Sequence, residues 1–134
     1  MKSLLAVALV LFPVSLAAQD SSAAPAAPQA VTVEAVLARN VMDRAPQDTG
    51  TAFPADVGGV VLWTRVTGGD GQTLNHVWFF GDTEVGNVPL TIGGSPWRTW
   101  SRKTIPAEAT GAWHVEIRDG AGTVLQRIDF TVGQ

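Results

Sequence analysis

The feature that most constrains the fold of this chain is a series of short runs in which apolar and polar residues alternate. Turn residues separate these runs. Residues 111–118 and 123–132 alternate cleanly, and residues 59–67 form a β-branched, apolar run. Successive side chains of a strand point to opposite faces, so alternation is typical of strands buried on one side. The glycine-rich segments 68–71 and 119–122 stand between such runs and predict hairpin turns. The chain is therefore expected to form strands, with almost no helix.

The remaining strands are expected at residues 33–41, 73–81, 85–92 and 97–105. Pro89 interrupts one of these runs, and proline cannot donate a ladder hydrogen bond, so that strand is expected at a sheet edge. Residues 43–56 are rich in Pro, Gly, Asp and Thr and predict a long loop, with Phe53 as its anchor in the core. The pattern predicts an all-β fold, an antiparallel immunoglobulin-like β-sandwich of about seven strands. A small barrel is the alternative.

Alternation also predicts which side chains form the core. The apolar faces comprise Trp113, Val115 and Ile117 in one strand and Val124, Ile128, Phe130 and Val132 in the next. Trp97 and Trp100 are an odd number of residues apart, so they fall on opposite faces of their strand. One of these two tryptophans is therefore expected to be partly exposed.

The N-terminus predicts a secretory signal peptide over residues 1–17. An apolar run at 4–16 follows a basic start, and Ser15 and Ala17 are small residues at the positions that a signal peptidase inspects. The run is shorter than the roughly 20 residues that a bilayer-spanning helix needs. No integral membrane segment is therefore expected in the mature chain.

Two further regions follow the signal peptide. Residues 18–29 consist mostly of Ala, Pro, Ser and Gln, which cannot bury a core, so they predict a disordered spacer. The β-sandwich domain is expected over residues 30–134. The chain has no cysteine, so it forms no disulfide and no thiolate metal site. Export without disulfides is common in the bacterial periplasm, and a periplasmic or secreted location is expected.

Composition argues against several functions. The formal net charge is −3, which lacks the basic field of a nucleic-acid binder, so no nucleic-acid partner is expected. The two histidines have no closely spaced ligand partners, so no metal and no cofactor are expected. A hydrolase would need Ser101 with a histidine base, but no Gly-x-Ser-x-Gly elbow surrounds this serine. The chain is not expected to be an enzyme.

The residues best suited to a ligand lie in two neighbouring predicted strands. The candidate ligand-binding residues are His76, Trp78, Arg98, Trp100, Ser101 and Lys103. An arginine offers a planar fork to a carboxylate or phosphate, lysine offers a point charge, and a tryptophan offers a flat face to a sugar ring. The alternative is structural: the cations are solvated or stack on tryptophan and hold the sheet edges.

The order of motifs in the second half resembles a known family. His-x-Trp is followed by Pro-Leu-Thr-Ile-Gly, Trp-Arg-Thr-Trp-Ser-Arg-Lys, Gly-Ala-Trp-His-Val-Glu-Ile and a final Phe-Thr-Val. This order is similar to that of bacterial domain of unknown function 2914, over about residues 31–134 and most specifically from His76 onward. The resemblance implies an envelope-associated, exported β domain and no established activity. The positions it carries over are His76, Trp78, Arg98, Ser101, Lys103, Gly111, Trp113 and Phe130.

We therefore expect an exported binding or interaction module of the bacterial envelope. Its partner would be an unknown envelope ligand, anionic or saccharide, or another protein. The alternative is a purely structural or assembly component of an envelope protein complex.

Overall fold

The computed structural model describes residues 31–133, and all regular structure in this part is β. The ten strands are β1 (Thr32–Ala38), β2 (Asn40–Met42), β3 (Ala45–Gln47), β4 (Ala52–Phe53), β5 (Gly59–Thr67), β6 (Thr73–Phe80), β7 (Thr83–Thr91), β8 (Trp97–Thr104), β9 (Gly111–Arg118) and β10 (Val124–Val132). The predicted signal peptide (1–17) and spacer (18–29) lie outside the described residues. No helix in residues 31–133 is long and apolar enough to cross a membrane.

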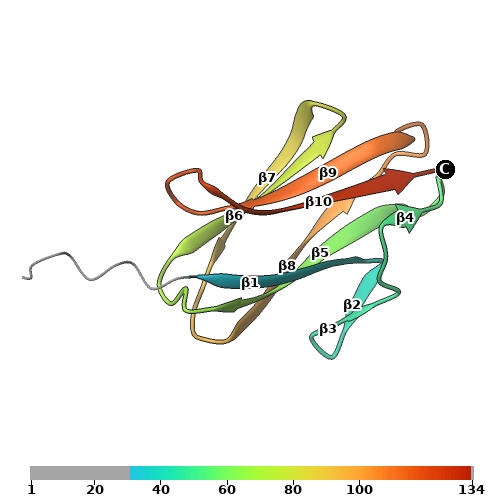
Figure 1. Cartoon of the computed structure of the whole chain (residues 1–134). Coiled ribbons are helices and arrows are strands. Elements are labelled where there is room, and N and C mark those ends of the chain that lie inside the picture. Colours follow the sequence, from blue (N-terminus) through green and yellow to red (C-terminus); the bar gives the residue numbers. More distant parts are fainter. Residues whose placement is uncertain (1–30, 134) are drawn as a thin grey trace, which may run out of the picture.

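Two sheets form a sandwich-like arrangement (Figure 1). One sheet has three strands in the order β1-β5-β8, and the other has five in the order β4-β10-β9-β6-β7. All pairings between the long strands are antiparallel, and β4 adds a short parallel pairing to β10. The hairpin of β2 and β3 forms a two-stranded sheet of its own. The predicted antiparallel β-sandwich is confirmed, with its long strands at the predicted positions.

Local differences from the prediction occur where the chain turns. The single strand predicted at 33–41 is two strands, because β1 ends at Ala38 and β2 begins at Asn40. The predicted loop at 43–56 contains the short strands β3 and β4, while Phe53 is buried in the core as expected. The proline-containing strand β7 lies at the edge of its sheet, as predicted.

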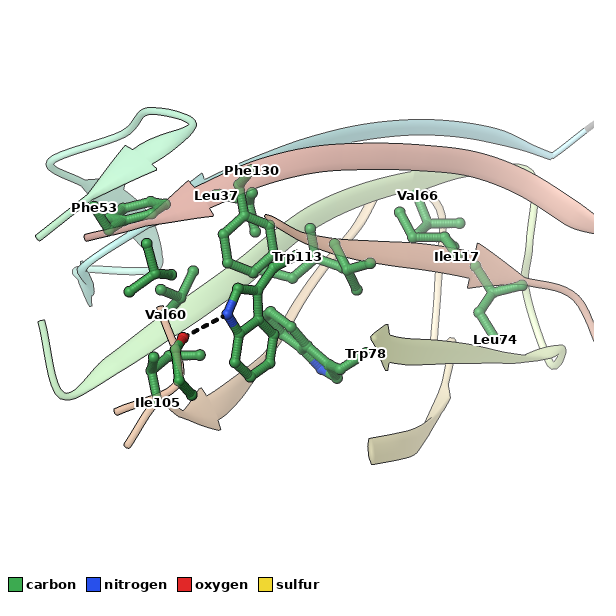
Figure 2. Close-up of a cluster of buried hydrophobic side chains, with 14 of the residues drawn as sticks. Leu37, Phe53, Val60, Val66, Leu74, Trp78, Ile105, Trp113, Ile117 and Phe130 are labelled. Carbon is green, nitrogen blue, oxygen red and sulfur yellow. Dashed lines mark hydrogen bonds between the residues drawn. The ribbon is translucent and has the colours of Figure 1, made fainter. Parts of the chain in front are cut away.

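The core lies between the two sheets and is centred on aromatic rings (Figure 2). Phe130 meets Phe53 and Trp78 edge-on, with ring centroids 6.0 and 6.2 Å apart, and stacks on Trp113 at 5.9 Å. The buried Trp113 indole also donates a hydrogen bond of 2.9 Å to the carbonyl oxygen of Ala109. Each ring therefore combines a large buried area with a defined contact geometry.

One residue assigned to the core by alternation is exposed. Val124 shares a predicted face with Phe130 and Val132, yet 46% of its surface is accessible. The register of β10 against β9 shifts between Val124 and Gln126. This bulge adds one residue to β10, so Leu125 packs against the core in place of its neighbour. Alternation fails here because a bulge reverses the faces on one side of it.

Candidate functional site

The six predicted ligand residues fall into two groups on opposite faces of β8. Ser101 and Lys103 point between the sheets, where His76 and Trp78 of β6 are buried. Arg98 and Trp100 lie on the outer face of the three-stranded sheet, and Trp100 is 38% exposed. The structure therefore does not bring the six residues together on one surface.

The inner group connects the two sheets through polar contacts. His76 Nδ1 and Ser101 Oγ are 2.7 Å apart and share a buried hydrogen bond. Lys103 Nζ donates to the carbonyl oxygen of Val85 on β7 at 2.8 Å. Burial lowers the pKa of the His76 imidazole from 6.5 to about 4, so this ring is neutral at pH 7. A neutral, buried imidazole adds no positive charge to a ligand site.

The same pair has the separation of a serine nucleophile and its base, but not the surroundings. Both side chains are buried between the sheets, where a substrate does not reach them. A base with a pKa near 4 is also weakly matched to proton transfer at neutral pH. The contact is better explained as a satisfied polar pair within the sandwich.

The outer face of the three-stranded sheet carries a different set of side chains. In the register of β5 and β8, Trp63 lies opposite Trp100 and Arg65 lies opposite Arg98. Directly opposed side chains on one sheet face have Cβ atoms about 5 Å apart, and like charges there are destabilising. Within residues 31–133, neither arginine forms a salt bridge with a carboxylate. Glu34 of β1 lies across from Arg65 in the register but does not pair with it.

A third arginine reaches this face from the hairpin of β2 and β3. Its two turn residues, Asp43 and Arg44, have φ angles of 52° and 63°. Two consecutive left-handed residues are typical of a type I′ turn, which matches the twist of the flanking strands. The Trp63 indole donates a hydrogen bond of 2.9 Å to the carbonyl oxygen of Arg44, and this bond fastens the turn to the sheet. The turn therefore holds Arg44 beside the outer face.

The hairpin and the sheet enclose a groove of about 650 Å³. Its lining residues are Arg44, Ala45, Pro46, Trp63, Arg65, Pro96, Trp97 and Arg98. Three of these side chains are guanidinium groups and none is a carboxylate, although the whole chain is net negative. The lining can supply planar donor forks to an anionic group.

Sequence reasoning found Arg98 but missed the other two arginines and Trp63. The alternation of β5 does place Trp63 and Arg65 on the face opposite the core, and this signal was available. The turn at Arg44 has neither Asn-Gly nor Asp-Gly, so nothing in the local sequence marks it as a hairpin.

Comparison with known proteins gives a family match for part of the chain and no function. No curated protein matches the chain. Among solved structures, a crystal structure of an engineered protein is similar at 19% identity with a TM-score of 0.42, over 79% of this chain and 20% of that one. That likeness is too weak to indicate a fold or a function.

The family match covers all five strands from β6 to β10. Residues 71–132 match the model described as "Protein of unknown function (DUF2914)". Arg98 and Trp100 lie within the matched segment, whereas Arg44 and Arg65 precede it. Residues 71–132 are thus similar to domain of unknown function 2914, which confirms the resemblance seen in the sequence over this segment.

Proposed function

We propose that this protein is an exported binding module of the bacterial envelope that holds an anionic ligand in the groove between the hairpin and the three-stranded sheet. The observation that carries the proposal is the convergence of three guanidinium groups on one groove whose lining contains no carboxylate. The predicted signal peptide supports export, to the periplasm or beyond it.

The repulsion between the opposed residues Arg65 and Arg98 supports the proposal, because an anionic ligand would relieve it. Two like charges directly across a strand pair repel each other, and neither arginine forms a salt bridge within residues 31–133, although Glu34 of β1 lies across from Arg65. An anion between the two guanidinium groups removes this repulsion and accepts charge-assisted hydrogen bonds from both. Local conflicts of this kind are expected where a fold serves binding.

The backbone at Arg44 supports the same site. A left-handed conformation is uncommon for a residue with a long side chain, and such residues cluster at ligand clamps. The bond from Trp63 holds the backbone of Arg44, so the base of this side chain is fixed beside the groove before any ligand arrives. A site ordered in advance loses less entropy on binding.

We propose binding rather than catalysis, because the groove contains cationic and apolar groups but no nucleophile and no base. The only serine–histidine contact in residues 31–133 lies buried on the inner side of β8. A structural or assembly role remains the competing function, and it predicts no affinity of the groove for anions.

The test is a calorimetric titration of the exported, purified protein with inorganic pyrophosphate at low ionic strength. We expect saturable binding that weakens by about tenfold or more in Arg65→Gln and Arg98→Gln, because each variant loses a hydrogen bond to a charged group. Arg127→Gln is the matched control, since Arg127 is exposed on the other sheet and outside the groove. Absence of binding, or an equal loss in the control, would contradict the proposal and favour an assembly role.

A further inference from the structure

We propose that the natural ligand is an acidic oligosaccharide that runs along β8, from the groove across Trp100 to Arg102. This inference rests on the proposed anion-binding function and extends it by naming the class and the path of the ligand. It is carried by a row of side chains beyond the groove.

The row consists of Arg98, Trp100 and Arg102, which alternate along the outer face of β8. Residues two apart in a strand share a face, and every residue adds about 3.3 Å to the length of the strand. The Cα atoms of the two arginines are therefore about 13 Å apart, with the tryptophan midway. That separation is longer than a single sugar ring, so a ligand that contacts both arginines must be a chain.

Trp100 has the exposure that a stacking platform needs. It is 38% exposed, whereas Trp63 opposite it is 7% exposed and is held by the hairpin. The face of an indole is electron-rich, so it attracts the C–H groups on the flat side of a sugar ring. Guanidinium groups on both sides of that ring can hold the carboxylates of an acidic sugar chain.

Arg102 is placed in advance at the far end of the row. Its guanidinium group lies over Gly59 of β5, where an added Cβ would come within 2.6 to 2.8 Å of three of its atoms. One nitrogen also donates to the carbonyl oxygen of Arg39 at 3.4 Å. Only one of five donors is used by this contact, so the others remain for a ligand. The absence of a side chain at Gly59 therefore leaves the space that the guanidinium group of Arg102 occupies.

The same residues argue against the two other linear polyanions. Single-stranded nucleic acids bind through several aromatic platforms on which successive bases stack, and this row has one exposed indole. An acidic peptide offers carboxylates but no rigid ring to cover Trp100. A chain of acidic sugars has both a ring face and a carboxylate in its repeating unit.

The first experiment measures affinity against ligand length. Galacturonic acid and its dimer, trimer and tetramer are titrated into the exported, purified protein, with pyrophosphate as the reference anion. We expect affinity to rise by about tenfold or more from monomer to tetramer as the chain reaches Trp100 and Arg102. In Trp100→Ala this gain should disappear, while pyrophosphate binding in the groove stays unchanged.

A second variant separates the position of Arg102 from its charge. Gly59→Ala forces the guanidinium group to move but keeps it, and the added methyl meets only the end of a flexible side chain. We expect about fivefold weaker tetramer binding with an unchanged melting temperature, since one charge-assisted contact is weakened. Gly120→Ala is the matched control, because its added Cβ would meet no atom closer than 3.9 Å.

The outcomes separate this inference from the proposed function. If pyrophosphate binds in the groove but affinity does not rise with sugar length, the extended saccharide path is wrong and the anion site stands. If neither pyrophosphate nor any oligomer binds, both proposals fail. Tighter binding of oligothymidylate or oligoglutamate than of the tetramer, lost in Trp100→Ala, would overturn the saccharide in favour of that polymer.

Discussion

The arginines on the two outer faces of this sandwich differ in whether they pair with a carboxylate. On the five-stranded sheet, Arg118 donates to Glu116 at 2.9 and 3.1 Å, and Arg127 donates to Asp129 at 2.9 and 3.0 Å. Each of these arginines thus has a carboxylate two residues away on its own strand. On the three-stranded sheet, Arg65 lies across from Arg98 on one side and from Glu34 on the other, and neither arginine forms a salt bridge within residues 31–133. The difference shows that, within the same residues, this face leaves both guanidinium groups without a carboxylate partner.

The aromatic residues on the two faces follow the same division. On the five-stranded sheet, Phe79 stacks on His114 with centroids 4.4 Å apart, and the Arg118 guanidinium lies 5.7 Å from the Phe79 ring. The two rings and the guanidinium group are therefore already in contact with one another. On the three-stranded sheet, Trp100 is exposed between Arg98 and Arg102, which form no salt bridge in the part of the chain that the structure describes. Paired charges make a stable surface, whereas unpaired charges around an exposed ring favour a ligand.

The largest effect should come from the core that both faces share. Replacing Trp113 with alanine removes a ring packed against Phe130 and leaves a cavity, so we expect about 3–5 kcal/mol less stability. Trp100→Ala should cost less than about 1 kcal/mol, because that ring is on the surface. Urea unfolding followed by tryptophan fluorescence measures both. Similar losses would mean that Trp100 is a structural residue and not a ligand platform.

The next effect concerns pH and the inner side of β8. The pKa of His76 is lowered by burial to about 4, so between pH 4 and 6.5 the unfolded chain binds a proton that the folded chain does not. Stability is therefore full above pH 6.5, and we expect it to fall by about 3 kcal/mol between pH 6.5 and 4 and to level off below pH 4.

Urea unfolding across this pH range measures the slope, which should flatten in His76→Gln and persist in His114→Gln. A binding affinity for pyrophosphate that follows the titration of His76 would break the proposed separation between the inner and outer sides of β8.

The smallest effect is expected from a variant that gives Arg65 a carboxylate partner like those of the arginines on the five-stranded sheet. Thr67 is exposed two residues after Arg65, so Thr67→Glu copies the spacing of the arginine–carboxylate pairs on the five-stranded sheet. We expect about 0.2–1 kcal/mol more stability from the new surface pair. Pyrophosphate affinity should fall, because Arg65 is then occupied. Thr123→Glu, a polar substitution distant from the groove, is the control. A stabilised variant with full affinity would show that Arg65 does not hold the anion.

Prediction from the sequence succeeded where the signal was local. The alternation of residues 59–67 and 111–118 marks β5 and β9, and Pro89 marks the edge strand β7. The odd spacing of Trp97 and Trp100 correctly placed one of them on the surface. Val124 was assigned wrongly, because the bulge beside it depends on how β10 pairs with β9.

The residues of the candidate site were harder to predict from the sequence than the strands, for the same reason. The sequence predicted Arg98 and Trp100, but it also grouped them with His76 and Ser101, which face the interior. Counting alternate residues from Trp97 separates the two faces of β8. That count does not tell which face is inner until the other sheet is in place.

The amino-acid sequence by itself determined the all-β class, the main strands and most of the buried aromatic core, because period-two alternation and turn residues act over a few neighbouring positions. Only the tertiary structure decided that Arg65 faces Arg98 and that Arg44 reaches the same groove. β5 and β8 are separated in the chain by two strands of the opposite sheet, so their register is set by packing across the sandwich. The local sequence carries no record of that packing, and the groove is a product of it.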